Sequence, residues 1–328
     1  MSTCPAPVRP LDATAAAELT TAAARLTAAY GSAASPALLA ALPGARARLG
    51  DEVRHGLRPV DTADGLFVLR GLPFDDAGAG PTPGHWSDAG GNGAPWDAVL
   101  LLVASLMGTP IAWDGQQGGR FVHDIVPAPG HESEQTGASS SVLLAPHTED
   151  AFHPGRAHLL LLCCLRNHDA VATTAASIRR TALAPADVTR LRRPVVPILP
   201  DDAYEEARRY AGTPAPVPTL FATPEGPTLR YDPAYTPLDA ADGPWRAAYR
   251  RLGDELARVS VAVSLEPGDV LVVDNDVVAH GRVPFRARYD GTDRWLKRAS
   301  VRVPGRRTRP AAEAAEHGYG QAARPAFG

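Results

Sequence analysis

Three residues of the chain have the types and the spacing of a metal site. His147 and Glu149 are separated by a single residue in the segment 146–150. In an extended strand, residues i and i+2 share a face, which brings an imidazole and a carboxylate to one metal-sized spot. A His-x-acid pair is expected about once by chance in a chain of this composition. His280 lies 133 residues downstream, directly after an apolar strand, where it could supply a third ligand.

This ligand set limits the chemistry. Two histidines and one carboxylate leave positions open on a bound metal, an arrangement that suits a non-heme Fe(II) that handles O2. A zinc hydrolase could use the same ligand types. The two alternatives differ in whether a bidentate organic co-substrate also has a place to bind.

Two arginines downstream of the distal histidine could hold such a co-substrate. If residues 294–303 form a strand, Arg294 and Arg298 point the same way and lie about 13 Å apart, at roughly 3.3 Å per residue. Guanidinium groups bind carboxylates through two parallel hydrogen bonds. A cavity with a metal and two separated arginines therefore fits two carboxylate-bearing ligands, a co-substrate and a substrate. Two solvated arginines on an edge strand would show the same spacing.

Short apolar segments separated by turns must position these residues. Helical periodicity predicts helices in the segments 11–30, 96–107 and 245–259. The residues 73–95 are rich in Gly, Pro and Asp and are expected to form a loop. Many short strands without regular βαβ alternation favour an antiparallel sandwich or jelly roll with helices packed outside it. The expected strands are 66–72, 120–126, 158–165, 195–199, 227–231, 270–273 and 298–303.

We expect the 328 residues to form a single domain. Residues 1–60 would be a helical N-terminal cover. Residues 61–305 would form the β core with its insertions and the helix near 245–259. Residues 306–328, rich in Arg, Ala and Pro, are predicted to be a loose C-terminal tail.

The composition excludes several classes of partner. The chain has 33 Lys and Arg against 36 Asp and Glu, a net charge of −3, with both signs spread along it. It therefore offers no basic stripe for nucleic acid and no polybasic segment for a membrane surface. No stretch reaches the roughly 18 apolar residues of a membrane span. The three cysteines, of which Cys163 and Cys164 are adjacent, form no disulfide framework, so we expect a cytoplasmic protein in a reducing compartment.

The order of motifs along the chain resembles the clavaminate-synthase-like family of Fe(II)/2-oxoglutarate-dependent oxygenases. Within that family it is similar to the arginine 3-hydroxylase of viomycin biosynthesis and the asparagine oxygenase of lipopeptide biosynthesis. The motifs that carry the resemblance are VLRG at 68–71, QQ at 116–117, HTEDAF at 147–152, LRN at 165–167, ATT at 172–174, LRYD at 229–232, DN at 274–275, HGR at 280–282 and the block 288–298.

The resemblance implies a mainly β fold with flanking helices, a distorted jelly roll that is also described as a cupin-like double-stranded β-helix. It implies that His147, Glu149 and His280 hold Fe(II) at the catalytic centre, with 2-oxoglutarate and O2 as co-substrates. Arg294 matches the arginine that binds the distal carboxylate of 2-oxoglutarate, and Thr173 matches the threonine that assists it.

The same resemblance assigns the substrate contacts. Arg298 matches an arginine that pairs with the α-carboxylate of an amino acid, and Gln116 matches a glutamine at its α-amino group, where Glu149 could also contribute. Asp232 matches an acid that binds the end of the substrate side chain. The arginine hydroxylase has a second acid at the position of Ala234, so this chain departs from its pattern.

The implied activity is hydroxylation of a free L-amino acid at its β-carbon (C3) for specialised metabolite or antibiotic biosynthesis. An arginine-like or other basic amino acid is the favoured small-molecule substrate, because the segment 147–150 departs from the neighbouring residues of the asparagine oxygenase. Asp201 and Asp202 could supply the negative charge that Ala234 does not. The alternatives are asparagine, desaturation, or an aminoacyl group tethered to a carrier protein, which would have no free carboxylate for Arg298. A more remote alternative is a non-catalytic jelly-roll protein that binds metal.

Overall fold

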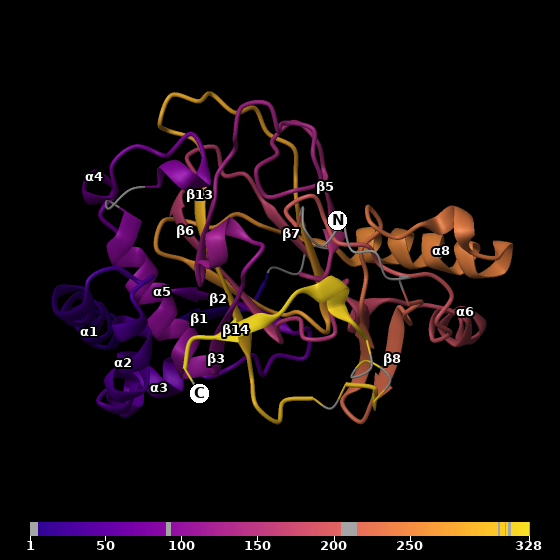
Figure 1. Cartoon of the computed structure of the whole chain (residues 1–328), viewed down its shortest axis with the longest axis horizontal. Coiled ribbons are helices and arrows are strands. Elements are labelled where there is room, and N and C mark those ends of the chain that lie inside the picture. The colour runs from indigo at the N-terminus through magenta and orange to yellow at the C-terminus, as the bar shows by residue number, and fades with distance from the viewer. Residues whose placement is uncertain are drawn as a thin grey trace.

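The computed structural model describes residues 6–89, 93–204, 215–307, 309–311, 313 and 316–327. Within these residues, a large and a small β-sheet pack together at the centre of the molecule, with helices on both outer sides (Figure 1). This is the mainly β fold with flanking helices that the sequence predicts.

The large sheet has eight strands. The two strands at one edge, β1 (Val8–Pro10) and β2 (Leu66–Arg70), are parallel, and all other neighbouring strands are antiparallel. Along the sheet the order is β1, β2, β11 (Val270–Asp274), β6 (Leu159–Arg166), β13 (Trp295–Arg302), β3 (Thr109–Trp113) and β14 (Ala323–Pro325), and β4 (Val122–Ile125) also pairs with β13.

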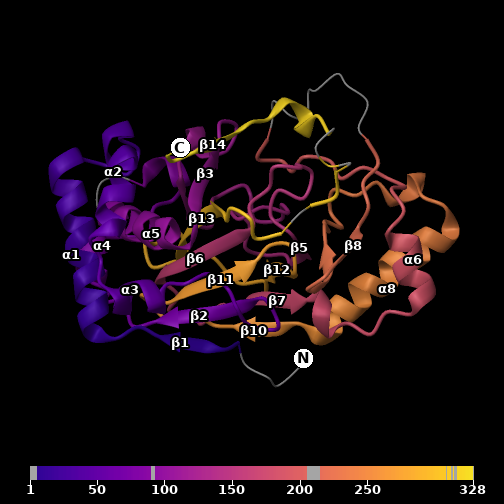
Figure 2. The same ribbon diagram turned by 90° about the horizontal axis from the view of Figure 1, so that it is seen from below.

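The small sheet has four antiparallel strands and carries most of the candidate metal site. Its order is β10 (Val261–Val263), β7 (Thr173–Ser177), β12 (Val278–Arg282) and β5 (Leu144–His147). A separate hairpin joins β8 (Leu220–Thr223) to β9 (Gly226–Leu229). Figure 2 shows β12, β7 and β10 beside the large-sheet strands β6, β11 and β2. The two packed sheets are the jelly-roll core that was expected.

Strand β6 shows why the sheets pack this way. Its alternate residues Leu160, Leu162 and Cys164 join the apolar cluster between the two sheets. The residues between them, Leu159, Leu161 and Cys163, join the cluster beneath the N-terminal helices. A strand covered on both faces must be apolar throughout, which explains the uninterrupted run in the sequence. Burial raises the pKa of both thiols, as expected for cysteines that serve as small apolar side chains.

Helices cover the outer face of the large sheet. They are α1 (Ala13–Tyr30), α2 (Pro36–Ala47), α3 (Asp51–Gly56) and α5 (Ala94–Met107). Asp12 caps α1, since its side chain accepts hydrogen bonds from the backbone N–H of Thr14 and Ala15. The predicted helices at 11–30 and 96–107 are confirmed, and α2 and α3 extend the cover.

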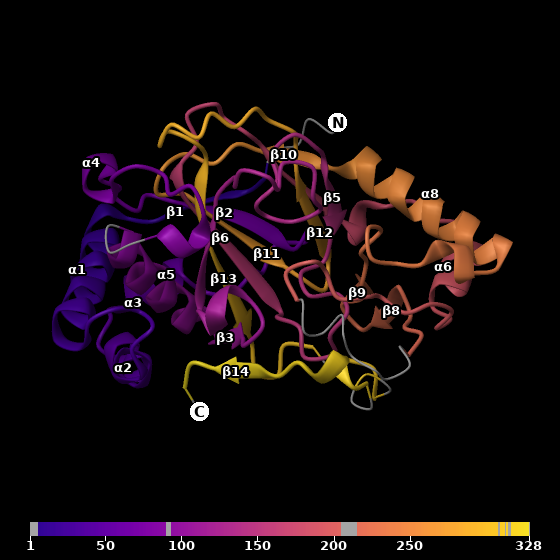
Figure 3. The same cartoon turned by 45° about the horizontal axis from the view of Figure 1, so that its top comes forward.

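On the other side, α8 (Gly243–Val259) packs against β7 of the small sheet, and α6 (Pro185–Leu191) packs against α8 (Figure 3). Trp245, Tyr249 and Leu252 of α8 are buried in the intersheet cluster, which confirms the helix expected near 245–259. Among the described residues, no helix combines the length and the apolar character that crossing a bilayer requires. The remaining short helices are α4 (Asp76–Ala79), η1 (Trp86–Asp88), η3 (Gln117–Gly119), η4 (Ile178–Arg180), η5 (Leu238–Ala240) and η7 (Gly318–Gly320).

Two local predictions were wrong. The segment 195–199 forms only an isolated bridge, Val196 to Val217, because prolines at 194, 197 and 200 remove the N–H donors that a strand needs. The segment 73–95 is not simply a loop, since it contains α4 and η1, while its residues 90–92 lie outside the described part. Buried Arg166 donates to the Asp76 carboxylate and to the Gly80 carbonyl, which holds this segment against the core.

The prediction of a loose C-terminal tail was also wrong for the residues that the structure describes. Strand β14 pairs with β3. Before it, Glu313 binds Arg156 at 2.9 Å and Glu316 binds Arg230 at 2.8 Å, and both arginines are buried. An acidic partner stabilises a buried guanidinium group, and the tail supplies one to each of these two arginines.

Candidate metal centre and ligand cavity

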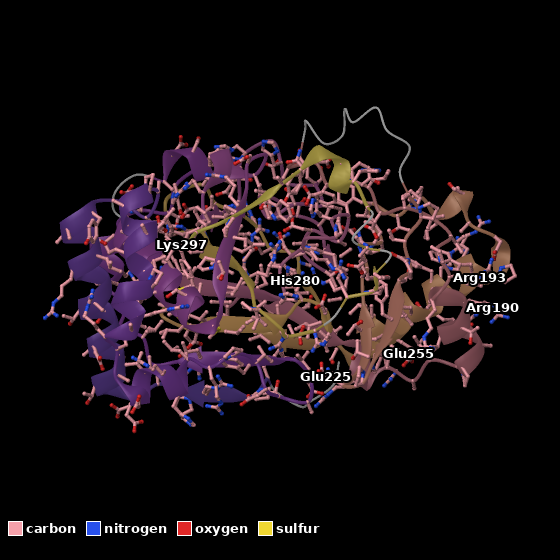
Figure 4. All side chains as sticks on the ribbon, turned by 60° about the horizontal axis from the view of Figure 1, so that its bottom comes forward. Arg190, Arg193, Glu225, Glu255, His280 and Lys297 are labelled. Atoms are coloured by element: carbon pink, nitrogen blue, oxygen red, sulfur yellow. The ribbon has the colours of Figure 1, made fainter. Side chains whose placement is uncertain are left out.

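The small sheet brings the three candidate metal ligands together. His147, the last residue of β5, lies directly opposite His280 of β12 in the strand pairing, and their ring centroids are 4.5 Å apart. Glu149 follows two residues later. One ligand atom from each residue lies within 4.8 Å of the others, and within the described residues this is the one such cluster of His, Cys, Asp or Glu. Figure 4 shows His280 near the middle of the molecule, between the two helical sides.

The orientation of the ligand atoms fits a metal ion. Nδ1 of His147 is 2.9 Å from the Ala145 carbonyl, so Nδ1–H donates there and Nε2 keeps its lone pair. Oε2 of Glu149 lies 3.4 Å from Nε2 of His280 and 3.9 Å from Nε2 of His147. This oxygen is buried and makes no hydrogen bond to any described residue. A cation between the three atoms would satisfy it.

Electrostatics keep Glu149 and His280 in the form that binds metal. Burial alone would raise the pKa of Glu149, but Arg298 and the two histidines outweigh it and hold that pKa well below its usual range. Burial, reinforced by the neighbouring His147, lowers the pKa of His280 to about 4. At neutral pH Glu149 is therefore a carboxylate and His280 a neutral imidazole, the protonation states that a metal requires of these ligands.

Arg294 is a buried cation without an acidic partner among the described residues. One of its amino groups donates to Oγ1 of Thr173 at 2.9 Å, as the resemblance implies. No carboxylate of the described residues lies within ion-pair distance of it, and burial lowers its pKa to about 10. Arg282 lies nearby, but its guanidinium donates to backbone carbonyls, including that of Val142 at 3.1 Å. A buried guanidinium with spare donors is a ready site for an anionic ligand.

Arg298 lies between the candidate metal carboxylate and a histidine that the sequence did not single out for this role. Its guanidinium is 2.5 Å from Oε1 of Glu149 and 2.9 Å from Nδ1 of His123. Burial and the charge of Arg298 lower the pKa of His123 to about 3, so this imidazole is neutral. Its Nε2–H donates to the Arg120 carbonyl, which leaves Nδ1 to accept from Arg298.

The metal cluster and both arginines line one cavity of about 940 Å³. Buried Gln116 also lines it, as do Asp201 and Asp202. Asp232 is not among the lining residues, because its carboxylate turns back to accept hydrogen bonds from the backbone N–H of Ala234 and Tyr235. The structure thus places the other predicted site residues around one cavity and leaves Asp232 beside it.

Buried neutral histidines outside the metal cluster predict how stability depends on pH. Burial, with a contribution from Arg309, lowers the pKa of His158 to about 4, and its Nδ1 accepts from the Val303 N–H. The unfolded chain binds this proton below about pH 6.5, whereas the folded chain does so only near pH 4. Stability should therefore be full above about pH 6.5 and fall as the pH is lowered towards 4.

The check is denaturant unfolding of the metal-free protein between pH 4.5 and 7.5. His158→Asn keeps an acceptor for Val303 and removes the titrating group, so its slope should be smaller by up to about 1.4 kcal/mol per pH unit. Equal slopes in the wild type and the variant would contradict the assignment.

Comparison with known proteins identifies the family. Residues 97–300, which include all three candidate ligands and both arginines, match the family described as "Taurine catabolism dioxygenase TauD, TfdA family". The chain belongs to the TauD/TfdA family. As a member of it, the protein is a non-heme Fe(II)/2-oxoglutarate-dependent dioxygenase that uses O2, and the alternatives of a zinc hydrolase and of a non-catalytic metal-binding protein are set aside.

Individual relatives of this TauD/TfdA enzyme span most of its length. It is 38% identical over 276 residues to the enduracididine beta-hydroxylase of Streptomyces hygroscopicus, covering 76% of this chain and 80% of that one. It is 36% identical over 284 residues to the L-asparagine oxygenase of Streptomyces coelicolor, covering 83% and 81%. The structure of the non-heme iron oxygenase OrfP in complex with Fe, succinate and (3R,4R)-dihydroxy-L-Arg has a TM-score of 0.81 and 39% identity, covering 90% of this chain and 94% of OrfP.

Proposed function

We propose that this enzyme hydroxylates a free L-amino acid with a basic side chain at the β-carbon, as a step of specialised metabolism. His147, Glu149 and His280 would hold Fe(II), and Arg294 with Thr173 would bind the distal carboxylate of 2-oxoglutarate. The observation that carries this proposal is the placement of the three ligands on the wall of one cavity with a buried arginine that pairs with no acid in the described part of the chain. When bound, Fe(II) with 2-oxoglutarate and O2 supplies the oxidising power that replaces C–H by C–OH.

The residues around the metal fit the two charged groups of a free amino acid. Arg298 would bind the α-carboxylate, while Gln116 and the Oε1 atom of Glu149 would accept from the α-ammonium group. The Arg298 to Glu149 contact of 2.5 Å places a cation and an anion side by side, a complement to the zwitterionic backbone of the substrate. An aminoacyl thioester on a carrier protein has no carboxylate for this buried arginine, which favours a free amino acid.

Binding at the α-carbon determines which hydrogen is attacked. Holding both α-substituents fixes the rotation of the substrate, so the adjacent β-carbon is presented to the metal in one orientation. His123 supports this by accepting a hydrogen bond from Arg298, which limits the rotation of the guanidinium.

The preference for a basic side chain rests on Asp201. Burial, together with the carboxylates of Asp150 and Glu149, raises the pKa of Asp201 to about 8. A cationic side chain beside these acids would relieve their repulsion, whereas a neutral amide would not. Tyr204 anchors the segment, since its hydroxyl donates to Asp150 at 2.5 Å and keeps Asp201 at the cavity wall. The similarity to the enduracididine beta-hydroxylase and to OrfP with a hydroxylated arginine supports the same choice.

A substrate panel tests the proposal. The Fe(II)-loaded enzyme is incubated with 2-oxoglutarate, O2 and one of arginine, enduracididine, ornithine, lysine, citrulline or asparagine, and succinate and the mass of the amino acid are followed. We expect a basic amino acid to gain one oxygen atom with matching succinate. Turnover of asparagine alone would contradict the basic side chain. Turnover of a carrier-bound aminoacyl group alone would contradict the free amino acid, and loss of two hydrogens would indicate desaturation.

Asp201→Asn is expected to lower kcat/KM for the best basic substrate by about 10- to 100-fold, the effect of losing a charged hydrogen bond worth about 1.5–3 kcal/mol. Activity on asparagine should change little, so the ratio of the two activities is the measurement. Asp114→Asn is the matched control, because Asp114 also lines the cavity but is exposed and paired with Arg324 at 2.5 Å. An equal loss of kcat/KM for the basic substrate in the two variants would contradict the role of Asp201.

A further inference from the structure

The backbone of Glu149 is not held by the sheet that holds the two histidines. Strand β5 ends at His147, so Glu149 lies beyond the last ladder position. The next residue, Asp150, has a φ of 52°, in the left-handed region of backbone conformation that residues other than glycine seldom adopt. Glu149 is therefore in an irregular segment, and something other than strand pairing must fix its carboxylate next to the histidines.

The side chain of Asn275 takes the place of that strand pairing. Its Oδ1 accepts from the Glu149 N–H at 2.7 Å, and its Nδ2 donates to the Glu149 carbonyl at 3.0 Å. Nδ2 also donates to the Ala157 carbonyl at 3.1 Å. The amide group thus binds both backbone polar groups of one residue, as a neighbouring strand would, and it is completely buried.

Asn275 also connects Glu149 to the strand of the distal histidine. It lies in the turn between β11, which ends at Asp274, and β12, which contains His280. The backbone N–H of Asn275 donates to the His158 carbonyl at 2.9 Å, which fixes the turn to the segment leading into β6. One amide therefore sets where the carboxylate stands relative to the strand that carries His280.

The acids on either side of Asn275 hold this turn in place. Buried Asp274 pairs with Arg306 at 2.9 Å and Arg307 at 2.8 Å, and buried Asp276 pairs with Arg309 at 3.1 Å. All three arginines belong to the segment after β13, the region predicted to be loose. Their charges are neutralised by the turn, so the C-terminal segment supports the residue that holds Glu149.

We infer that Asn275 is a positioning residue for the metal centre: its amide holds the backbone of Glu149 so that the carboxylate meets the imidazoles of His147 and His280. This inference rests on the proposed assignment of these residues as Fe(II) ligands. Residues that orient metal ligands typically contribute about 10- to 100-fold to metal affinity.

The test compares Asn275→Ala with Asn167→Ala. Asn167 is also buried and makes the same pattern of three hydrogen bonds, to the Val171 N–H, the Val171 carbonyl and the Leu265 carbonyl, but it contacts no candidate metal ligand. Fe(II) is titrated anaerobically into each metal-free protein by calorimetry, and the absorption of the Fe(II) and 2-oxoglutarate complex is recorded. Thermal unfolding of the metal-free proteins measures the purely structural cost.

We expect both variants to lose stability, but only Asn275→Ala to bind Fe(II) about 10- to 100-fold more weakly and to shift the absorption band. Unchanged Fe(II) affinity and an unchanged band in Asn275→Ala would overturn the inference and leave the proposed function intact. If the wild type binds Fe(II) with no dependence on His147, the proposed function fails instead.

If Asn275→Ala does not fold, the wild-type protein decides the question. The Glu149 amide should then show slow hydrogen exchange in the metal-free state, although it lies beyond the end of β5, because it donates to the buried Asn275. Exchange as fast as that of exposed loop amides would overturn the inference.

Discussion

His147→Ala is expected to abolish hydroxylation and succinate formation together. The substitution removes one of three ligand atoms, so Fe(II) affinity should fall by more than about 100-fold, beyond the range typical of residues that only orient ligands. No other described group of His, Cys, Asp or Glu could hold the metal in its place. Anaerobic calorimetry with Fe(II), together with a succinate assay, measures both losses.

The fold should survive this change. The side chain of His147 is 20% exposed at the cavity wall, and its own hydrogen bond is to the nearby Ala145 carbonyl. His168→Ala, at an exposed position outside the cavity, is the matched control and should behave as the wild type. A His147→Ala enzyme that still bound Fe(II) tightly and formed succinate would place the metal elsewhere.

Arg294→Gln is expected to raise the KM for 2-oxoglutarate by about 30- to 5,000-fold. Truncating one partner of a buried, hydrogen-bonded charge pair costs about 2–5 kcal/mol, and this range of KM is that cost converted at 1.36 kcal/mol per factor of ten. Arg294 is buried, donates to Thr173 and pairs with none of the described acids, so its remaining N–H donors are available to the distal carboxylate of 2-oxoglutarate. Steady-state kinetics at varied 2-oxoglutarate concentration provide the measurement.

The stability of the metal-free protein separates binding from folding. Because no described acid pairs with Arg294, replacing it removes an uncompensated buried charge and should leave stability unchanged or higher. Arg294→Lys keeps the charge but loses the planar guanidinium that makes two parallel hydrogen bonds. Its KM for 2-oxoglutarate should therefore lie between those of the wild type and Arg294→Gln. If Arg282→Gln raised the KM while Arg294→Gln did not, Arg282 would be the residue that binds 2-oxoglutarate.

The candidate site was predictable where residues share local geometry. His147 and Glu149 are two residues apart, and His280 follows an apolar strand, so strand periodicity and motif order indicated a cluster that the structure confirms. The spacing of Arg294 and Arg298 likewise placed both on the same cavity. Short apolar segments likewise predicted most of the strands, and helical periodicity predicted the helices at 11–30, 96–107 and 245–259.

The remaining features depend on contacts between distant parts of the chain. No sequence periodicity signals the pairing of Arg307 with Asp274, so the ordered C-terminal segment was missed. The hydrogen bonds between Asn275 and Glu149 likewise leave no pattern in the sequence. Asp232 illustrates another limit. A local turn decides whether an acidic side chain faces a cavity or accepts hydrogen bonds from its own backbone. The Asp232 carboxylate accepts from the Ala234 N–H.

The most direct test of the proposed reaction is labelling with ¹⁸O2. The enzyme is supplied with Fe(II), 2-oxoglutarate and L-arginine, or the best substrate of the panel, and the products are analysed by mass spectrometry and NMR. We predict one ¹⁸O atom in succinate and one in a hydroxyl group on C3 of the free amino acid. Succinate without labelled amino acid, or a label on any other carbon, would contradict β-hydroxylation at the centre formed by His147, Glu149 and His280.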